Sequence, residues 1–124
     1  MELKLNIYNE NDEVEKTYTT QTFRIKLGLL NDFINIMNAE RLSVVLKNVG
    51  NSKERDNEAL ITLVCELLGE SKQIVYDLFK QLFKGLTDDE LNNCYIDELV
   101  AVVKDVTKYA VKVIGLADKE KEKN

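Results

Sequence analysis

The residues of this chain that could do chemistry are few, and the densest group is acidic. The run from Asp88 to Glu90 is followed a few residues later by Asp97 and Glu98. Carboxylates can bind a divalent cation, but these lack the Asp-x-Asp-x-Asp-Gly spacing and terminal Glu of an EF-hand loop. Thr87 and Glu90 instead match the Ser/Thr-x-x-Glu capping box, which satisfies the first amide groups of a helix. We therefore interpret the cluster as a helix start and expect no metal site.

The sequence also contains no motif for nucleophilic catalysis. The chain contains no His, so a Ser or Cys nucleophile would need Lys, Asp or Glu as its base, and no motif supplies one. Cys65 and Cys94 stand far apart without a Cys-x-x-Cys grouping, and we expect buried or half-buried thiols, with a disulfide or reactive thiol as the alternative. The five glycines are isolated and form no phosphate-binding loop. We expect no enzyme and no cofactor.

Composition narrows the class of protein further. A length of 124 residues, with 44% hydrophobic and 31% charged residues, predicts one folded core. The net charge of -5 disfavours nucleic acid as a partner, because it offers no overall positive field for phosphates. No apolar run approaches the roughly 20 residues of a membrane span, and the first residues do not resemble a signal peptide. We expect a cytoplasmic protein without membrane contact.

The first quarter of the chain has the pattern of a β-hairpin. Leu3, Leu5 and Ile7 alternate with polar residues, and residues 9–13 are typical of a turn. Residues 16–25 are rich in β-branched and aromatic side chains, which favour strands. The hairpin is therefore expected over residues 2–25.

From residue 26 onward the apolar residues recur at helical spacing. Expected helices cover 26–38, 58–68 with Gly69 as its end, 71–84 with Gly85 as its end, a short segment after Thr87, and 96–114. Residues 40–49 favour a helix but are compatible with a strand, and 50–57 resemble a solvated loop. The predicted fold class is α+β, mainly α: an N-terminal β-hairpin followed by a bundle of about four to five helices. Residues 1–117 would form one domain, with helices over 26–115, and 118–124 a charged flexible tail.

The last predicted helix is unusually apolar. Its hydrophobic residues cover roughly 200° of its circumference, whereas a surface helix needs little more than about 100°. Either the rest of the chain wraps it, or one side serves self-association or a client. Helix 71–84 has the same ambiguity. The candidate protein-contact surface is the aromatic and Val flank of these two helices, namely Tyr76, Phe79, Tyr95, Val102 and Tyr109.

Two regions in combination resemble a known family. The opening Leu3-Lys4-Leu5-Asn6-Ile7, a polar turn, Lys16-Thr17-Tyr18 and an apolar helix resemble the N-terminus of tail assembly chaperones of long-tailed bacteriophages. The block from Ile74 to Leu91, followed by Asp97-Glu98-Leu99, is similar to that family's recurring helix, Phe-rich end, Thr-acidic turn and final helix. The resemblance covers most of the chain and rests on pattern and element order.

The resemblance implies a function without catalysis. Such a chaperone is made in the host cytoplasm, coats the long hydrophobic tape-measure protein before the tail tube polymerises, and is absent from the mature virion. The family often makes a longer product by ribosomal frameshifting, whose added domain recruits tail tube protein. The alternative from the residues alone is a small helical regulatory or assembly adaptor protein acting through protein contacts.

Overall fold

The fold consists of a two-stranded hairpin and helices packed around one core. The computed structural model describes the backbone of residues 2–47 and 54–123, and the side chains of 2–47 and 58–112. Within these ranges the elements, in chain order, are β1 (Leu3–Tyr8), β2 (Val14–Thr20), α1 (Leu27–Lys47), α2 (Glu54–Leu82), α3 (Asp88–Leu91) and α4 (Ile96–Lys123). The predicted class, α+β and mainly α with an N-terminal hairpin, is confirmed.

The hairpin places one apolar face on the core. β1 and β2 pair antiparallel with Leu5 opposite Tyr18, and the register shifts by a bulge between Ile7 and Tyr8. Leu3, Leu5 and Ile7 are all buried, as their alternation predicted. Pairing ends at Thr20, so the expected second strand is too long: residues 21–26 form an irregular connection to α1.

Helices α1 and α2 each contain a break that the sequence pattern anticipated. In α1, Asn38 has φ 56° and ψ 175°, and its side-chain oxygen accepts a hydrogen bond from the backbone amide of Arg41 at 3.0 Å. Asn38 therefore caps a second helical segment, which confirms the helical interpretation of residues 40–47; residues 48 and 49 lie outside the described ones. In α2 the break falls at Ser71, with φ −144° and ψ 48°, two residues after the expected end at Gly69.

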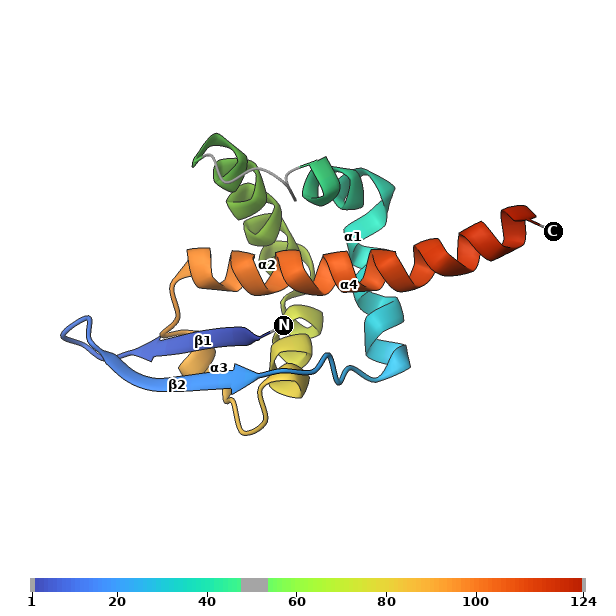
Figure 1. Cartoon of the computed structure of the whole chain (residues 1–124). Helices are drawn as coiled ribbons and strands as arrows, with labels where there is room; N and C mark the ends of the chain where they lie inside the picture. Colours follow the sequence, from blue (N-terminus) through green and yellow to red (C-terminus); the bar gives the residue numbers. More distant parts are fainter. Residues whose placement is uncertain (1, 48–53, 124) are drawn as a thin grey trace.

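Helix α2 begins earlier and helix α4 ends later than expected. Residues 54–57, which we assigned to a loop, already belong to α2, whereas 50–53 lie outside the described residues. Helix α4 runs through Gly115 to Lys123, so the segment that we expected to leave the helix as a tail is helical. A single Gly costs a helix only about 1 kcal/mol, and the Ala, Lys and Glu residues that follow are strong helix formers. The end of α4 projects beyond the other elements (Figure 1).

Helix α4 is the central element of the core. It crosses α1 and α2 and also packs on β1 (Figure 1). Val103, Val106 and Ala110 on α4 are buried, and the buried hydroxyl of Thr107 donates to the carbonyl of Val103 at 2.7 Å. Over residues 96–112, the wide apolar arc of this helix is thus largely covered by the chain itself. None of the helices in the described part is long and apolar enough to cross a membrane.

Candidate functional site

The structure separates the five residues of the predicted contact surface. Phe79 has no exposed side-chain surface and Val102 is 2% exposed, so both belong to the core. This corrects the prediction for these two residues, because neither side chain is available to a partner. Tyr76 is half-buried, and its hydroxyl donates to the side-chain oxygen of Asn92 at 2.6 Å. Tyr95 and Tyr109 remain exposed, at 46% and 36%.

Tyr95 and Tyr109 do not form one surface. Tyr95 directly precedes α4 and Tyr109 lies fourteen positions later on this helix, which corresponds to about 21 Å. The Tyr95 ring meets Tyr8 edge-on with centroids 4.6 Å apart, and its hydroxyl donates to Asp12 in the hairpin turn. Tyr109 stacks on Phe23 at 4.5 Å, beyond the other end of the hairpin. The two tyrosines therefore fasten opposite ends of the hairpin region to α4.

Glu98 holds β1 on the first turn of α4. Its carboxylate accepts from the backbone amide of Asn6 at 3.1 Å and from the hydroxyl of Tyr8 at 2.5 Å. The hydrogen bond from Tyr8 to this carboxylate raises the pKa of the Tyr8 phenol. A residue considered above as a possible metal ligand thus has a structural role.

Glu90 is the second polar anchor of the hairpin. The capping box is confirmed: Thr87 Oγ1 accepts from the Glu90 amide at 3.2 Å, and Glu90 accepts from the Thr87 amide at 3.1 Å. The same carboxylate accepts from the Tyr18 hydroxyl at 2.6 Å and pairs with Lys16 at 3.4 Å. The Tyr18 hydrogen bond is the main cause that lowers the pKa of Glu90. Among residues 2–47 and 58–112, no three His, Cys, Asp or Glu side chains are grouped as a metal site would require.

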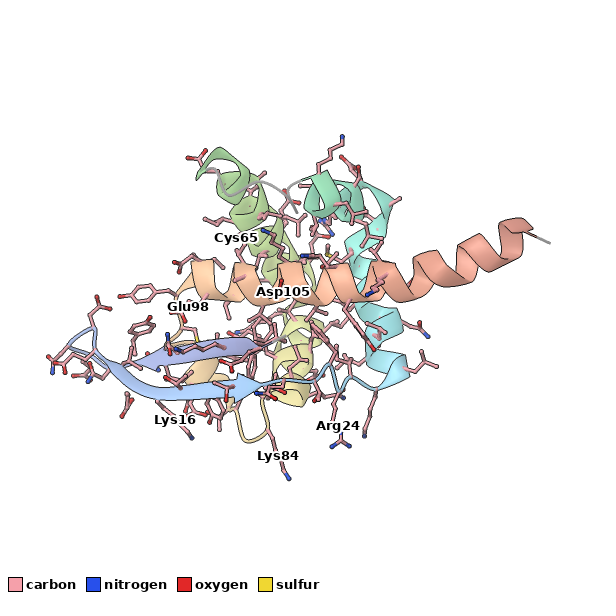
Figure 2. The ribbon with its side chains drawn as sticks, in the orientation of Figure 1. Lys16, Arg24, Cys65, Lys84, Glu98 and Asp105 are labelled. Atoms are coloured by element: carbon pink, nitrogen blue, oxygen red, sulfur yellow. The ribbon has the colours of Figure 1, made fainter. Side chains whose placement is uncertain are left out.

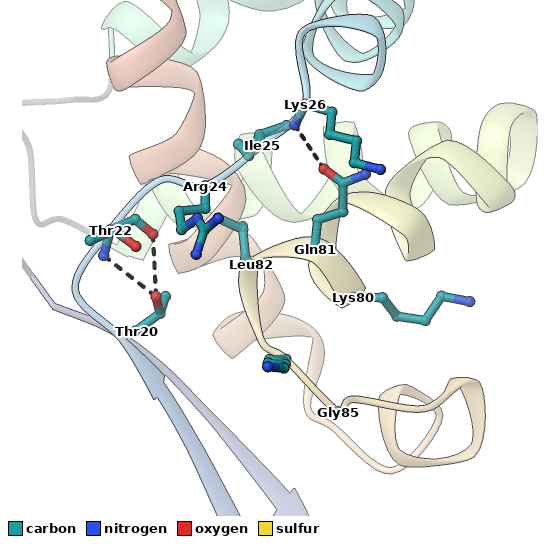
Figure 3. Close-up of a pocket in the computed structure, with 10 residues that line it drawn as sticks. Thr20, Thr22, Arg24, Ile25, Lys26, Lys80, Gln81, Leu82 and Gly85 are labelled. Carbon is teal, nitrogen blue, oxygen red and sulfur yellow. Dashed lines mark hydrogen bonds between the residues drawn. The ribbon is translucent and has the colours of Figure 1, made fainter.

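A basic pocket lies between the β2–α1 connection and the end of α2 (Figure 3). It has a volume of about 610 Å³, and Arg24, Lys26, Lys80 and Lys84 line it without any acidic residue. Lys80 is engaged with Asp88 at 2.9 Å and more distantly with Asp77. The other three cations have no ion pair within the described part of the chain. Sequence analysis missed this pocket, because its cations come from segments more than 50 residues apart.

A second depression is the α1–α2 groove, formed by the part of α1 after Asn38 and the first half of α2. Its volume is about 390 Å³, and it is lined by apolar, small and charged residues: Asn38, Glu40, Arg41, Val44, Ala59, Thr62, Leu63 and Glu66. Arg41 fixes its two walls by donating to the carbonyl of Ile36 at 2.7 Å and to Glu70 at 2.5 Å. The only sequence signal for this groove was the helical pattern of residues 40–49.

The cysteines differ from each other. Cys65 is exposed, contrary to our expectation, whereas Cys94 is half-buried and its thiol donates to the carbonyl of Glu90 at 3.4 Å. Burial, with the nearby Glu98 and Glu90 carboxylates, raises the pKa of Cys94 to about 12. Neither forms a disulfide.

We expect a maleimide at neutral pH to label Cys65 at least about tenfold faster than Cys94, because the thiolate is the reactive form and Cys94 rarely provides it. Mass spectrometry over time measures both rates. The fast phase of maleimide labelling should be absent from the Cys65→Ser variant and present in the Cys94→Ser variant. Equal rates for the two thiols would contradict the burial of Cys94.

Comparison of the chain with protein-family models, curated proteins and solved structures found no match. The functional proposals that follow therefore rest on the residues, their geometry and the resemblance described above.

Proposed function

We propose that this protein is a non-enzymatic tail assembly chaperone of a long-tailed bacteriophage, which binds and solubilises the tape-measure protein in the host cytoplasm before tail tube polymerisation. The observation that carries the proposal is the α1–α2 groove, an open depression with apolar residues between two helices. The resemblance in pattern and element order supports the identity of the client. A longer frameshifted product would link the same chaperone to the tail tube protein.

The groove has the composition expected of a site for an amphipathic helix. Among its lining residues, Leu63 is buried and Val44 is half-buried, while Ala59 and Thr62 are small and exposed. Arg41 and Glu66, paired at 3.3 Å, provide a charged rim. Apolar anchors of a client helix, spaced three and four residues apart, can enter such a groove while its polar face remains in water.

The size of the groove suits a reversible coat. A depression of about 390 Å³ accepts few side chains, so each contact is weak. Many copies along one long client nevertheless bind firmly, because linked contacts raise the effective concentration of the next one. Tube subunits that polymerise on the client can then displace the copies one at a time, without a chemical step.

Co-expression with an otherwise insoluble tape-measure fragment tests the proposal. We expect the chaperone to increase the soluble fragment severalfold, and Ala59→Glu with Thr62→Arg to remove most of this gain, because both changes put long charged side chains into the groove. The soluble fraction is measured by centrifugation and quantitative gel analysis.

The matched control is Ala101→Glu, which makes the same type of change at an exposed position of α4. It should solubilise the client like the unchanged protein. A folded groove variant that retains full activity would exclude the groove as the client site. No effect of the unchanged protein on any tape-measure fragment would contradict the chaperone function itself.

A further inference from the structure

We propose that the acidic turn of the hairpin in one copy docks into the basic pocket of a second copy, so that the protein associates head to tail. The acidic turn is the segment Glu10–Glu15, and the basic pocket is the one lined by Arg24, Lys26 and Lys84. This interface is independent of the client proposed above.

The basic pocket is an unusual feature of a chain with a net charge of -5. Arg24 and Lys84 extend from the same side of the molecule (Figure 2), and Lys26 lies at the neighbouring wall (Figure 3). Their charges are not neutralised by any acidic residue of the described chain. Half-buried Ile25 and buried Leu82 add an apolar component to the lining. The pocket thus favours an acidic segment that also carries an apolar side chain.

The acidic turn matches this description. Glu10, Asp12, Glu13 and Glu15 place four carboxylates within six residues, and Glu10, Glu13 and Glu15 are exposed without an ion pair among the described residues. Val14, between two of them, is 52% exposed. The turn is held in shape by Asn9, whose side-chain oxygen accepts from the amides of residues 11 and 13 at 2.9 and 3.0 Å. It can therefore dock with little loss of conformational entropy.

The fold prevents the two surfaces from meeting within one copy. The acidic turn includes the first two residues of β2 and the basic pocket begins at the last residue of this strand, Thr20, so the strand keeps the tip of the turn about 20 Å from the pocket. In Figure 1 the turn lies at the end of the hairpin that is away from α1. Tyr95 holds Asp12 of this turn, whereas Glu10, Glu13 and Glu15 remain exposed. A turn-to-pocket contact is heterologous when the partner's own turn does not return to the pocket of the first copy, and it then generates a ring or a filament rather than a closed two-fold dimer. Such an array could place successive copies along an extended client.

Mass measurement on mixed variants tests this geometry. The turn variant carries Glu10→Gln, Glu13→Gln and Glu15→Gln; the pocket variant carries Arg24→Gln, Lys26→Gln and Lys84→Gln. We expect the unchanged protein to form concentration-dependent oligomers by sedimentation velocity, with association at least about tenfold weaker in 0.5 M than in 0.05 M NaCl. Each variant alone should be a monomer. Their mixture should form a 1:1 dimer that does not grow, because only one intact turn and one intact pocket remain.

The control variant removes three exposed carboxylates elsewhere, with Glu2→Gln, Asp32→Asn and Asp89→Asn, and should associate like the unchanged protein. A monomer at about 100 μM in low salt, or oligomers that survive in either variant, would overturn the proposal. Oligomers lost in the pocket variant alone would also overturn it, since another acidic segment would then occupy the pocket. Solubilisation of the tape-measure fragment is measured in a separate experiment. Failure of the proposed self-association therefore does not decide the proposed chaperone function, and the reverse also holds.

Discussion

Val102→Asp should destabilise the protein by about 3–5 kcal/mol, because the carboxylate would be placed without a partner in the core. Val102 is 2% exposed and lies on the face of α4 that the rest of the chain covers. A domain of this size is stable by only about 5–15 kcal/mol, so the loss is a large fraction of the total. Urea unfolding followed by circular dichroism measures it.

The neighbouring substitution Ala101→Asp is the matched control. Ala101 is exposed, so the same residue type enters the same turn of the same helix without burial. Its effect should stay near the small helix propensity difference between Ala and Asp, below about 1 kcal/mol. Equal effects at the two positions would show that residue 102 faces solvent, and the contact surface first predicted from the sequence would then be restored.

Glu90→Ala should cost about 2–3 kcal/mol, although Glu90 is neither apolar nor fully buried. The change removes half of the capping box at α3 and the charged acceptor of the Tyr18 hydroxyl, which keeps only the Gly85 carbonyl at 3.2 Å. Lys16 also loses its ion pair, which contributes less because the lysine is exposed. Thermal and urea unfolding measure the loss, and Asp89→Asn, one residue away in the exposed first turn of α3, should cost far less.

The same carboxylate predicts an acid dependence. Its hydrogen bond from Tyr18 lowers the folded-state pKa below the ordinary 4.5, so the unfolded state takes up the proton first as the pH falls. Its contribution to stability is complete above that ordinary value and is lost as the pH falls through the lower folded-state pKa. The stability difference between the unchanged protein and Glu90→Gln should therefore shrink between about pH 6 and pH 3. A difference that stays constant over this range would contradict the assigned role of Glu90.

These two anchors show how the acidic residues serve the fold. Glu90 and Glu98 each bind a tyrosine of the hairpin, Tyr18 and Tyr8, and so connect the N-terminal strands to segments 70 or more residues later in the chain. A two-stranded hairpin alone is marginal in water and needs such packing. Both carboxylates are thus engaged within the fold, and the partner surfaces that we propose, namely the α1–α2 groove, the acidic turn and the basic pocket, do not include them.

Much of the local structure could be predicted from the sequence. Alternation in residues 3–7 predicted β1, helical spacing predicted most of α1, α2 and α4, and the capping box at Thr87 predicted α3. These features are decided by neighbours a few residues apart, for which spacing alone is sufficient. The absence of apolar residues in 118–124 predicts that α4 ends near residue 114, but the helix continues to Lys123 because its Ala, Lys and Glu residues are strong helix formers.

The side of a helix that meets the core could not be predicted in the same way. The sequence determined that α4 is apolar over a wide arc, but Val102 and Phe79 proved to be core residues only because α4 packs on β1 and α2. Likewise, Arg24 and Lys84 line one pocket because the β2–α1 connection packs beside the end of α2. Periodicity reports that a face is apolar or charged, whereas tertiary packing alone decides which neighbour covers it and which surface remains open.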